Sequence, residues 1–385
     1  MTFNSKNLSI VFDLGTTEIK GAVMKNDGTL VQKVTQQNYT TVTDSNRHEQ
    51  DAIFWWKAIC SVSNELCESH KIHSVIVTGQ MQNLLLLNTK GSPLQEVILY
   101  SDQRSIEESE WLLQNSCYLD LVAKTGNEQG PTSLLAKLLW IKKHQPEIFS
   151  KTDCLLPGAS DYVVFRMTGE KATDTTTAST TGLMELVERK WIDEALFNKM
   201  GLQGVQTLLP KLFDGGAKIG ELQKKAATDL GIPAGLPVFL GPGDAGSATI
   251  GAGCGVPGKA YAYIGTSGWV AFAEKQPADP TTGVITLSHP KCDHFIQVAP
   301  LLTAGGNLEW AKSLSNFESY DSLINDAISS PLSNLIFLPY LKGERSPFID
   351  PKARGAFIGL HSTTGQSEMN RAVLEGICFA FRHAL

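Results

Sequence analysis

The chain has 385 residues, of which 42% are hydrophobic and 19% are charged, and its formal net charge is −6. A chain of this length and composition can bury a large core and should form more than one domain. It has no basic run, which argues against a nucleic-acid partner, and no apolar run of membrane-spanning length. Its opening residues lack both a signal-peptide core and an Arg-rich amphipathic pattern, so we expect a cytoplasmic protein without a membrane partner.

The first predicted elements are two apolar strands, 8–12 and 19–24, separated by Asp13 and a short turn. The turn consists of Gly15, Thr16 and Thr17. Glycine lets the backbone approach a ligand, threonine N–H and O–H groups donate to phosphate oxygens, and a carboxylate can orient Mg²⁺. We therefore predict that the turn binds phosphate and that Asp13 has a metal role. The alternative is an ordinary hairpin with polar turns.

A helix is predicted over 51–70, where apolar residues recur at helical spacing and the tryptophans belong to the core. A short strand, 74–78, follows and runs into a polar loop before a second apolar stretch at 84–87. A polar loop between two buried strands can reach a ligand. The candidate substrate-binding residues of this loop are Gln80, Met81 and Gln82.

Asp102 and Arg104 place an acid and a base two residues apart, and such a pair can bind sugar hydroxyls. The alternative is a solvated ion pair that opens the helix through Trp111. A further helix is predicted over 133–144, closed by Pro146. The Thr-rich stretch 172–181 is predicted to be a loop or an exposed edge strand.

Asp244 follows a buried strand, 238–240, and a Gly-Pro-Gly turn, and it precedes a small apolar stretch predicted as a helix over 245–252. The N–H groups at a helix N-terminus favour an ionised carboxylate. An ionised aspartate beside a substrate hydroxyl can act as general base in phosphoryl transfer. The alternative is that Asp244 only caps the helix.

The strand, hydroxyl-rich turn and strand pattern recurs at 260–274. This second turn contains the further candidate phosphate ligands Gly265, Thr266 and Ser267. A repeat of this kind indicates a duplicated core. Two such hairpins facing each other across a cleft would hold one nucleotide triphosphate, and this pair of motifs resembles the actin, Hsp70 and sugar kinase superfamily.

Residues Gly355 to Glu375 carry the spacing Gly-x-Phe-x-Gly-Leu, seven residues, Glu-Met-x-x-Ala-Val-Leu-Glu. This pattern resembles the C-terminal signature of the FGGY carbohydrate kinases at every fixed position, and the helix with Lys137 and Trp140 is similar to their other signature. The resemblance implies an α/β fold of two ribonuclease H-like domains, 1–248 and 249–385, with a cleft between them. It also implies ATP and Mg²⁺ as cofactors and Asp244 as the catalytic base, and it leaves a homodimer open.

Within the family, the Gly-Gln-Met loop and the Gly-Glu-Arg-Ser-Pro element are similar to those of xylulokinases, which implies phosphorylation of a ketopentose such as xylulose. This chain has Gln82 where xylulokinases usually have histidine. An amide can still bond a hydroxyl, but with a different reach and no titration. Gluconate, L-xylulose or another polyol is therefore the alternative substrate.

Two other classes of protein remain as alternatives: a non-catalytic sugar or nucleotide sensor, and an actin-like assembly protein. Retention of Asp13 and Asp244 argues against the sensor, and the FGGY signature argues against the filament. The sequence ends at Leu385 inside the helix predicted from Glu368, before any Gly-rich adenine loop. We therefore expect a truncated chain with exposed Cys378, Phe379 and Phe381, weak ATP affinity and impaired catalysis.

Overall fold

The structure, a computed structural model, describes residues 7–44, 46–67, 70–291, 293–315, 317–350 and 352–385. The chain divides into two compact units, and each combines a β-sheet with helices, in agreement with the predicted α/β class. The first unit is Met1–Gly251 with Leu287–His294, and the second is Ala252–Thr286 with Phe295–Leu385. The predicted boundary at residues 248 and 249 lies inside α10 (Gly243–Gly251).

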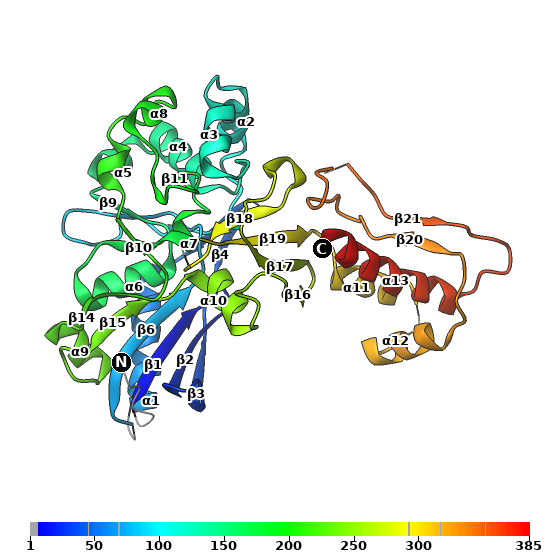
Figure 1. Cartoon of the computed structure of the whole chain (residues 1–385), viewed down its shortest axis with the longest axis horizontal. Helices are drawn as coiled ribbons and strands as arrows, with labels where there is room; N and C mark the ends of the chain where they lie inside the picture. The colour runs from blue at the N-terminus through cyan, green and yellow to red at the C-terminus, as the bar shows by residue number, and fades with distance from the viewer. Residues whose placement is uncertain (1–6, 45, 68–69, 292, 316, 351) are drawn as a thin grey trace. The chain divides into compact units, whose positions relative to one another are not determined.

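A six-stranded sheet in the order β14-β15-β6-β1-β2-β3 forms the centre of the first unit (Figure 1). Its strands are β1 (Leu8–Leu14), β2 (Glu18–Lys25), β3 (Leu30–Gln37), β6 (Ile72–Gly79), β14 (Ala217–Glu221) and β15 (Pro237–Leu240). The strand β1 pairs antiparallel with β2 and parallel with β6, and β6 pairs parallel with β15. Three parallel strands therefore end at one edge of this sheet.

Three helices pack against this sheet and against one another: α1 (Ala52–Cys67), α6 (Ala159–Thr168) and α9 (Lys224–Leu230). The predicted helix over 51–70 is thus confirmed as α1 for residues 52–67, while residues 68 and 69 lie outside the described residues. Its tryptophans Trp55 and Trp56 are buried. Helix α1 lies so close to β2 that a Cβ on Gly21 would come within 2.3 Å of the Val62 side chain. The small residue in the strand allows this close packing.

A second buried core of the first unit lies among shorter elements, which Figure 1 shows around α4 (Leu134–His144). The helices are α2 (Ile106–Gln114), α3 (Tyr118–Thr125), α5 (Pro146–Lys151), α7 (Thr175–Ala178), α8 (Glu194–Lys199) and the 3₁₀ turn η1 (Val205–Leu208). The strands are β4 (Thr41–Asp44), β5 (Arg47–Gln50), β7 (Leu85–Leu87), β8 (Val97–Ile98), β9 (Cys154–Leu156), β10 (Ala172–Asp174), β11 (Met184–Glu185), β12 (Lys190–Trp191) and β13 (Lys211–Phe213). The predicted helix over 133–144 is confirmed as α4, where the Ser133 side chain accepts from the Ala136 N–H as an N-cap.

The expectation of a loop or exposed edge strand at 172–181 is wrong. These residues form β10 and α7, and nearly all of them are buried. Burial is tolerated because most of their hydroxyls have hydrogen-bond partners among the described residues, those of Thr173 and Thr175 excepted. The Thr176 hydroxyl donates to the Ser288 carbonyl at 2.7 Å, and the Ser179 hydroxyl accepts from the Ser288 N–H at 3.0 Å. The segment 287–294 thus belongs to the first unit although the chain around it belongs to the second.

The second unit is built on a four-stranded sheet in the order β16-β17-β19-β18. Its strands are β16 (Ala260–Ile264), β17 (Gly268–Glu274), β18 (Ile285–Ser288, the last two residues of which belong to the first unit) and β19 (Phe295–Leu301), with the separate pair β20 (Ile336–Leu338) and β21 (Ala356–Ile358). Its helices are α11 (Gly305–Ser313), α12 (Tyr320–Ser329), α13 (Gln366–Ala384) and the 3₁₀ turn η2 (Pro280–Thr282). Helix α13 packs against β20, α12 and α11.

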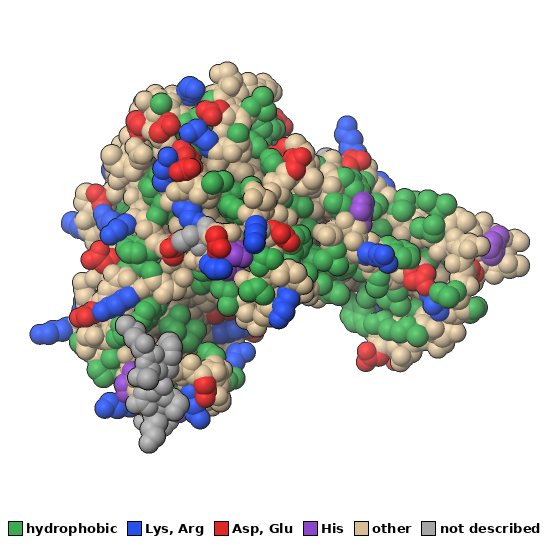
Figure 2. Space-filling view, viewed as in Figure 1, with side chains coloured by type: hydrophobic (Ala, Val, Ile, Leu, Met, Phe, Trp, Pro, Cys, Tyr) green, Lys and Arg blue, Asp and Glu red, His purple; other side chains and the backbone are tan. Residues whose placement is uncertain are grey.

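Large apolar side chains remain exposed on the second unit, and Figure 2 shows hydrophobic residues gathered on its visible face. Phe379 is 59% exposed and Cys378 is also exposed, as expected from the sequence. Phe381 was expected to be uncovered as well, but it packs into the core of the second unit with 9% exposure, because it lies on the inner face of α13. Within the described residues, no helix is long and apolar enough to cross a bilayer.

We predict that Phe12→Ala destabilises the first unit by about 3 to 5 kcal/mol, because Phe12 is fully buried in its core and alanine would leave a cavity. Urea unfolding followed through tryptophan fluorescence measures the change. The matched control is Val31→Ala on the neighbouring strand β3, where the side chain is 41% exposed and the expected change is within about 0.5 kcal/mol. Equal losses for the two variants would contradict this assignment of the core.

Candidate active site

The predicted catalytic and metal residues of the first unit lie at the carboxyl ends of β1, β6 and β15. Because parallel strands end at the same edge of a sheet, the segments that follow them come together there. Gln80 donates its backbone N–H to the Leu14 carbonyl at 2.9 Å, and the Gly241 N–H donates to the Val77 carbonyl at 2.7 Å. The structure therefore brings Asp13, the Gln80 loop and the turn before Asp244 to one edge.

Asp13 lies opposite Lys20 on β2 and opposite Thr78 on β6. Its side chain is half-buried, and burial raises the pKa of the carboxyl, while the positive charges of Lys20 and Lys33 partly offset this. Among the described residues, no hydrogen-bond donor contacts the Asp13 carboxylate. A carboxylate without a donor at a strand end can serve as an oxygen ligand for a hard cation.

The turn after β1 is closed by a hydrogen bond from the Gly15 N–H to the Glu18 carbonyl at 3.0 Å. A Cβ on Gly15 would lie 2.8 Å from that same carbonyl oxygen, so the turn needs glycine there. Thr17 is exposed and Thr16 is half-buried. The Thr16 hydroxyl donates to the Gln80 side chain at 3.2 Å, so in this structure its hydrogen is used inside the protein.

The loop 80–82 has one buried and two partly exposed residues. Gln80 is 1% exposed, and its amide bonds to Gln50 and Thr16. Met81 packs so tightly against the turn before Asp244 that a Cβ on Gly243 would meet its sulfur at 2.1 Å. Gln82 has a left-handed backbone, with φ of 60°, and its Nε2 donates to the Thr180 carbonyl at 3.0 Å.

Asp244 lies in the first turn of α10 and accepts from the Ala245 N–H at 2.7 Å. The hydroxyl of Ser247, one turn further along the helix, contacts the Thr78 hydroxyl on β6 at 2.9 Å and holds the helix against that strand. Solvent reaches Asp244, yet the protein atoms around it and the negative charge of Asp13 raise the pKa of its carboxyl to about 7, against the smaller effect of the Ala245 N–H.

The direction of this pKa shift corrects an expectation from the sequence. Helix N–H groups were expected to favour the ionised form of Asp244, which would lower its pKa. In the structure, desolvation and the neighbouring carboxylates, Asp13 and Asp174, outweigh that effect. A carboxylate with a pKa near neutrality can exchange a proton at working pH, which a general base must do.

Asp102 and Arg104 form a buried ion pair, so the alternative of a solvated pair is wrong. Asp102 is fully buried, and Arg104 donates to both of its carboxylate oxygens, at 2.9 and 2.8 Å, and to Glu49 at 2.7 Å. Burial alone would raise the pKa of Asp102. The hydrogen bonds from Arg104 and from the His48 N–H, together with the Arg104 charge, hold it below its usual range.

Lys137 lies under this ion pair and is fully buried. Its Nζ donates to the Leu99 carbonyl at 2.6 Å. Burial lowers the pKa of Lys137 to about 7; the negative charge of Asp102 raises this pKa, and the positive charge of Arg104 lowers it further. The Arg104 guanidinium also lies over the Trp140 ring, 5.1 Å from its centroid. Of the two residues quoted for the N-terminal family signature, Trp140 thus contacts the Asp102–Arg104 pair, and Lys137 bonds the Leu99 carbonyl close to it.

In the second unit, the turn with Gly265, Thr266 and Ser267 joins β16 to β17, and its threonine and serine are exposed. Its carbonyls are held by the start of α11, because the Gly305 N–H donates to Gly265 at 2.8 Å and the Gly306 N–H donates to Thr266 at 2.9 Å. Among the residues that the structure describes, no hydrogen-bond acceptor contacts the N–H or the hydroxyl of Thr266. The turn can therefore donate to an anion, as the first turn can.

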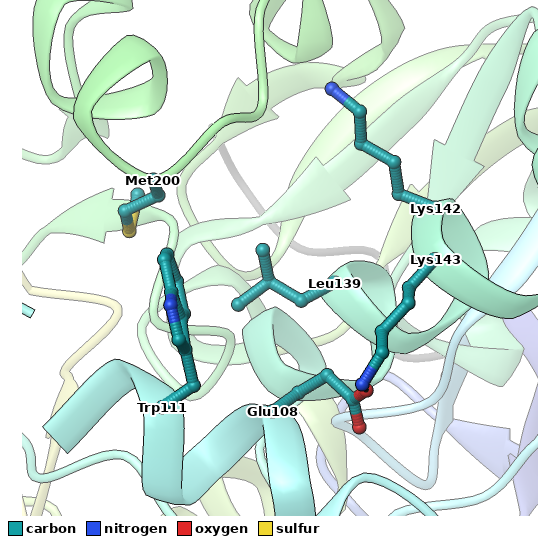
Figure 3. A pocket seen from close by; sticks show the side chains of 6 residues that line it. All are labelled: Glu108, Trp111, Leu139, Lys142, Lys143 and Met200. Carbon is teal, nitrogen blue, oxygen red and sulfur yellow. The ribbon is translucent and has the colours of Figure 1, made fainter. Parts of the chain in front are cut away.

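A separate hollow of about 340 Å³ lies in the helical part of the first unit, beside α2 and α4 (Figure 3). It is lined by Glu108, Trp111, Leu139, Lys142, Lys143 and Met200. Figure 3 shows the Lys143 ammonium at the Glu108 carboxylate, 3.1 Å away, so these two charges compensate each other. No predicted site residue lines this hollow, and we do not place the chemistry there.

Sequence reasoning missed Gln50 and Asn38, two buried amides that hold the predicted loops. Gln50 contacts Thr16 and Gln80, and Asn38 donates to the Gly15 carbonyl at 2.9 Å. Each lies in a polar segment with no periodic apolar pattern. A lone polar residue between exposed neighbours gives no local sign of burial, so nothing in the sequence marked them.

Comparison with known proteins agrees with this geometry. The fold, the site and the comparison together identify the chain as a carbohydrate kinase. Residues 8–251 match the N-terminal domain, and residues 260–385 the C-terminal domain, of the FGGY family of carbohydrate kinases. The chain belongs to this family, which confirms the resemblance seen in the sequence.

The chain is similar to the xylulose kinase of Escherichia coli strain K12, with 33% identity over 96% of this chain and 76% of that protein. Among solved structures, it resembles a ligand-bound xylulose kinase from Lactobacillus acidophilus with a TM-score of 0.89, 29% identity and coverage of 98% of this chain and 77% of that one. A gluconate kinase from the same species gives a TM-score of 0.88 at 28% identity, covering 98% and 78%. These structures confirm the predicted two-domain sugar kinase fold.

We predict that Arg104→Gln destabilises the first unit by about 3 to 5 kcal/mol, because it leaves the buried Asp102 carboxylate without its charged partner. The matched control is Arg47→Gln, which breaks an exposed pair with Asp44 and should cost less than about 1 kcal/mol. Urea unfolding of both variants makes the comparison. A loss for Arg104→Gln no larger than for the control would mean that the pair has little structural weight.

Proposed function

We propose that this protein transfers the γ-phosphoryl group of ATP to a hydroxyl of a ketopentose such as xylulose, with Asp244 as the general base. The observation that carries the proposal is the position of Asp244. It follows the carboxyl end of a parallel strand in a turn that packs against Met81, and the charge of Asp13 raises its pKa. The family match and the relatives named xylulose kinase support it.

In the proposed reaction, the sugar hydroxyl oxygen attacks the γ-phosphorus, and its proton passes to the Asp244 carboxylate. The bond between the γ-phosphorus and the bridging oxygen breaks, and ADP leaves. The pKa of about 7 makes Asp244 a stronger base than an ordinary aspartate while a large share of it stays ionised near neutral pH. We assign substrate positioning to Met81, which packs against the turn before Asp244, and to Gln82, which donates to the Thr180 carbonyl.

The residues present fit a magnesium site at Asp13. Its carboxylate accepts no hydrogen bond from the described residues, and its charge raises the pKa of a second carboxylate, Asp244. Mg²⁺ prefers oxygen ligands of this kind. When bound with ATP, Mg²⁺ would neutralise charge on the phosphate oxygens. We propose that Thr16 and Thr17 donate to the nucleotide phosphates, and that Thr266 and Ser267 of the second unit do the same. The N–H groups of Gly15 and Gly265 bond the Glu18 and Ser267 carbonyls, so we assign these glycines to the shape of the two phosphate turns.

Gluconate is the second candidate substrate, because one of the similar solved structures is a gluconate kinase. Asp102, Arg104 and Gln80 were also predicted to touch the substrate. All three are buried, and their polar atoms bond to other protein groups, so we propose that they shape the sugar loop from behind.

We predict that Asp244→Asn folds normally and binds the sugar but loses roughly 10²- to 10⁴-fold in kcat, because the amide cannot accept the hydroxyl proton. In the wild type, kcat/KM should rise with pH through about 7, since the raised pKa of Asp244 leaves the base protonated below that value. A coupled ADP-release assay between pH 5.5 and 8.5 measures both effects.

The control for this experiment is Asp120→Asn in the first turn of α3, where the side chain is exposed. It should keep the wild-type rate and the wild-type pH profile. If Asp244→Asn stayed within a few-fold of wild type, the residue would be a helix cap and not the base.

We further predict that Gln82→His changes the order of sugars by kcat/KM more than it changes the KM for ATP, because only contacts that differ between substrates alter discrimination. D-xylulose, L-xylulose, D-gluconate, D-ribulose and glycerol make up the substrate panel. A neighbouring control is Gln95→His in the loop before β8, a residue not assigned to the site. An unchanged order of sugars would remove Gln82 from the sugar site.

A further inference from the structure

Gln50, the last residue of β5, is 1% exposed and uses its whole side-chain amide in hydrogen bonds. Oε1 accepts from Asn38 Nδ2 at 3.2 Å, Trp55 Nε1 at 3.0 Å and Gln80 Nε2 at 2.8 Å, and Nε2 donates to the Thr16 carbonyl at 2.8 Å and the Thr40 hydroxyl at 2.9 Å. Both donor hydrogens and the acceptor oxygen of this amide are thus satisfied. Its partners come from four separate segments of the chain.

Two partners fix which way the Gln50 amide points. The Trp55 indole N–H can only donate, so it must face Oε1, and the Thr16 carbonyl can only accept, so it must face Nε2. This orientation does not depend on telling nitrogen from oxygen by position alone. The amide of Gln50 therefore has one allowed orientation.

The orientation of the Gln50 amide also determines the orientations of the Gln80 amide and the Thr16 hydroxyl. Because Gln50 presents Oε1 to Gln80, Gln80 must turn its Nε2 toward Gln50 and its Oε1 toward Thr16. The Thr16 hydroxyl must then donate to Gln80, since an amide oxygen can only accept. Three residues thus form a closed ring of hydrogen bonds in which each donor and acceptor is determined.

The ring joins the two loops to which the proposed function assigns different ligands. Thr16 belongs to the proposed phosphate turn, and Gln80 begins the proposed sugar loop. Asn38 is a further partner of Gln50, and it donates to two carbonyls of the turn. Its side-chain amide donates to the Gly15 carbonyl, and its backbone N–H donates to the Thr17 carbonyl at 2.8 Å. The turn is therefore held through its carbonyls and through the Gly15 N–H. Within the described part of the chain, this leaves the N–H groups of Thr16 and Thr17 and the exposed Thr17 hydroxyl available to an anion.

We propose that Gln50 is a positioning residue that fixes the position of the phosphate turn relative to the sugar loop. The two substrates would then be held at a fixed distance and orientation for transfer. This inference rests on the proposed function, because it takes the two loops as substrate sites. Gln50 touches no substrate. Its effect should therefore fall on the rate of transfer more than on the binding of either substrate, since misplacement of about 1 Å can cost roughly a hundredfold in rate.

The test is Gln50→Met, which keeps the length of the side chain and removes every hydrogen bond. We expect kcat to fall roughly tenfold to a hundredfold, while the Kd of the sugar, measured by calorimetry, changes less than about threefold. The indole N–H resonance of Trp55, assigned with Trp55→Phe, should move upfield because it loses its acceptor. Gln50→Asn, which keeps an amide too short to reach both loops, is the second variant if methionine does not fold, and the same rate loss is expected.

The matched control is Thr40→Val, which removes a Gln50 partner that lies in neither loop. It should keep kcat within about twofold, and the Trp55 resonance should stay in place. A Gln50 variant with wild-type kcat, or one whose sugar Kd weakens as much as kcat falls, would overturn the positioning role. A wild-type protein that phosphorylates none of the sugars tested would instead overturn the proposed function, and this inference with it, so the two failures are distinguishable.

Discussion

Where β1 and β6 run in parallel, Leu14 lies opposite Gly79 and Asp13 lies opposite Thr78. The strands are so close at this point that a Cβ on Gly79 would come within 2.8 Å of the Leu14 side chain and 2.9 Å of its carbonyl. A larger residue would force the strands apart and separate the loop at 80–82 from the turn at 15–17. The whole arrangement of acids and donors at the sheet edge depends on this one close pairing.

Around that pairing, the first unit buries an unusual number of polar groups. Most hydroxyls of 173–181, the side chains of the Asp102–Arg104 pair and the Gln50 amide are removed from water. An unpaired buried polar group is costly, whereas a paired one restricts the structure to a single arrangement. The loops that carry the proposed ligands are therefore held by hydrogen bonds behind them and not by contacts with solvent-facing atoms, which suits a site that must be formed before the substrates arrive.

Two aspartates of the same unit illustrate how environment decides chemistry. Asp102 is buried against a guanidinium that donates to both of its oxygens, and its pKa is lowered. Asp244 is reached by solvent, but desolvation by the protein atoms around it and the charges of two other carboxylates outweigh its backbone N–H contacts and raise its pKa to about 7. Asp102 therefore stays ionised and stabilises the fold through its pair with Arg104. Asp244 can gain and lose a proton near neutral pH, which is the property that phosphoryl transfer to a hydroxyl requires.

Local pattern was enough to predict β1, β2, α1, α4 and α10, because alternation, helical periodicity and turn chemistry depend on residues a few positions apart. It also placed Asp13 and Asp244 after buried strands, and the signature at 355–375 identified the family. Tertiary structure alone decided the burial of 172–181, the hydrogen bonds of Gln50 and the direction of the Asp244 pKa shift. Each depends on a partner far along the chain: Thr176 on Ser288, 112 residues away, Gln50 on Gln80, 30 residues away, and Asp244 on Asp13. A polar residue has the same identity in sequence whether water or another buried group satisfies it, and only the folded chain determines which.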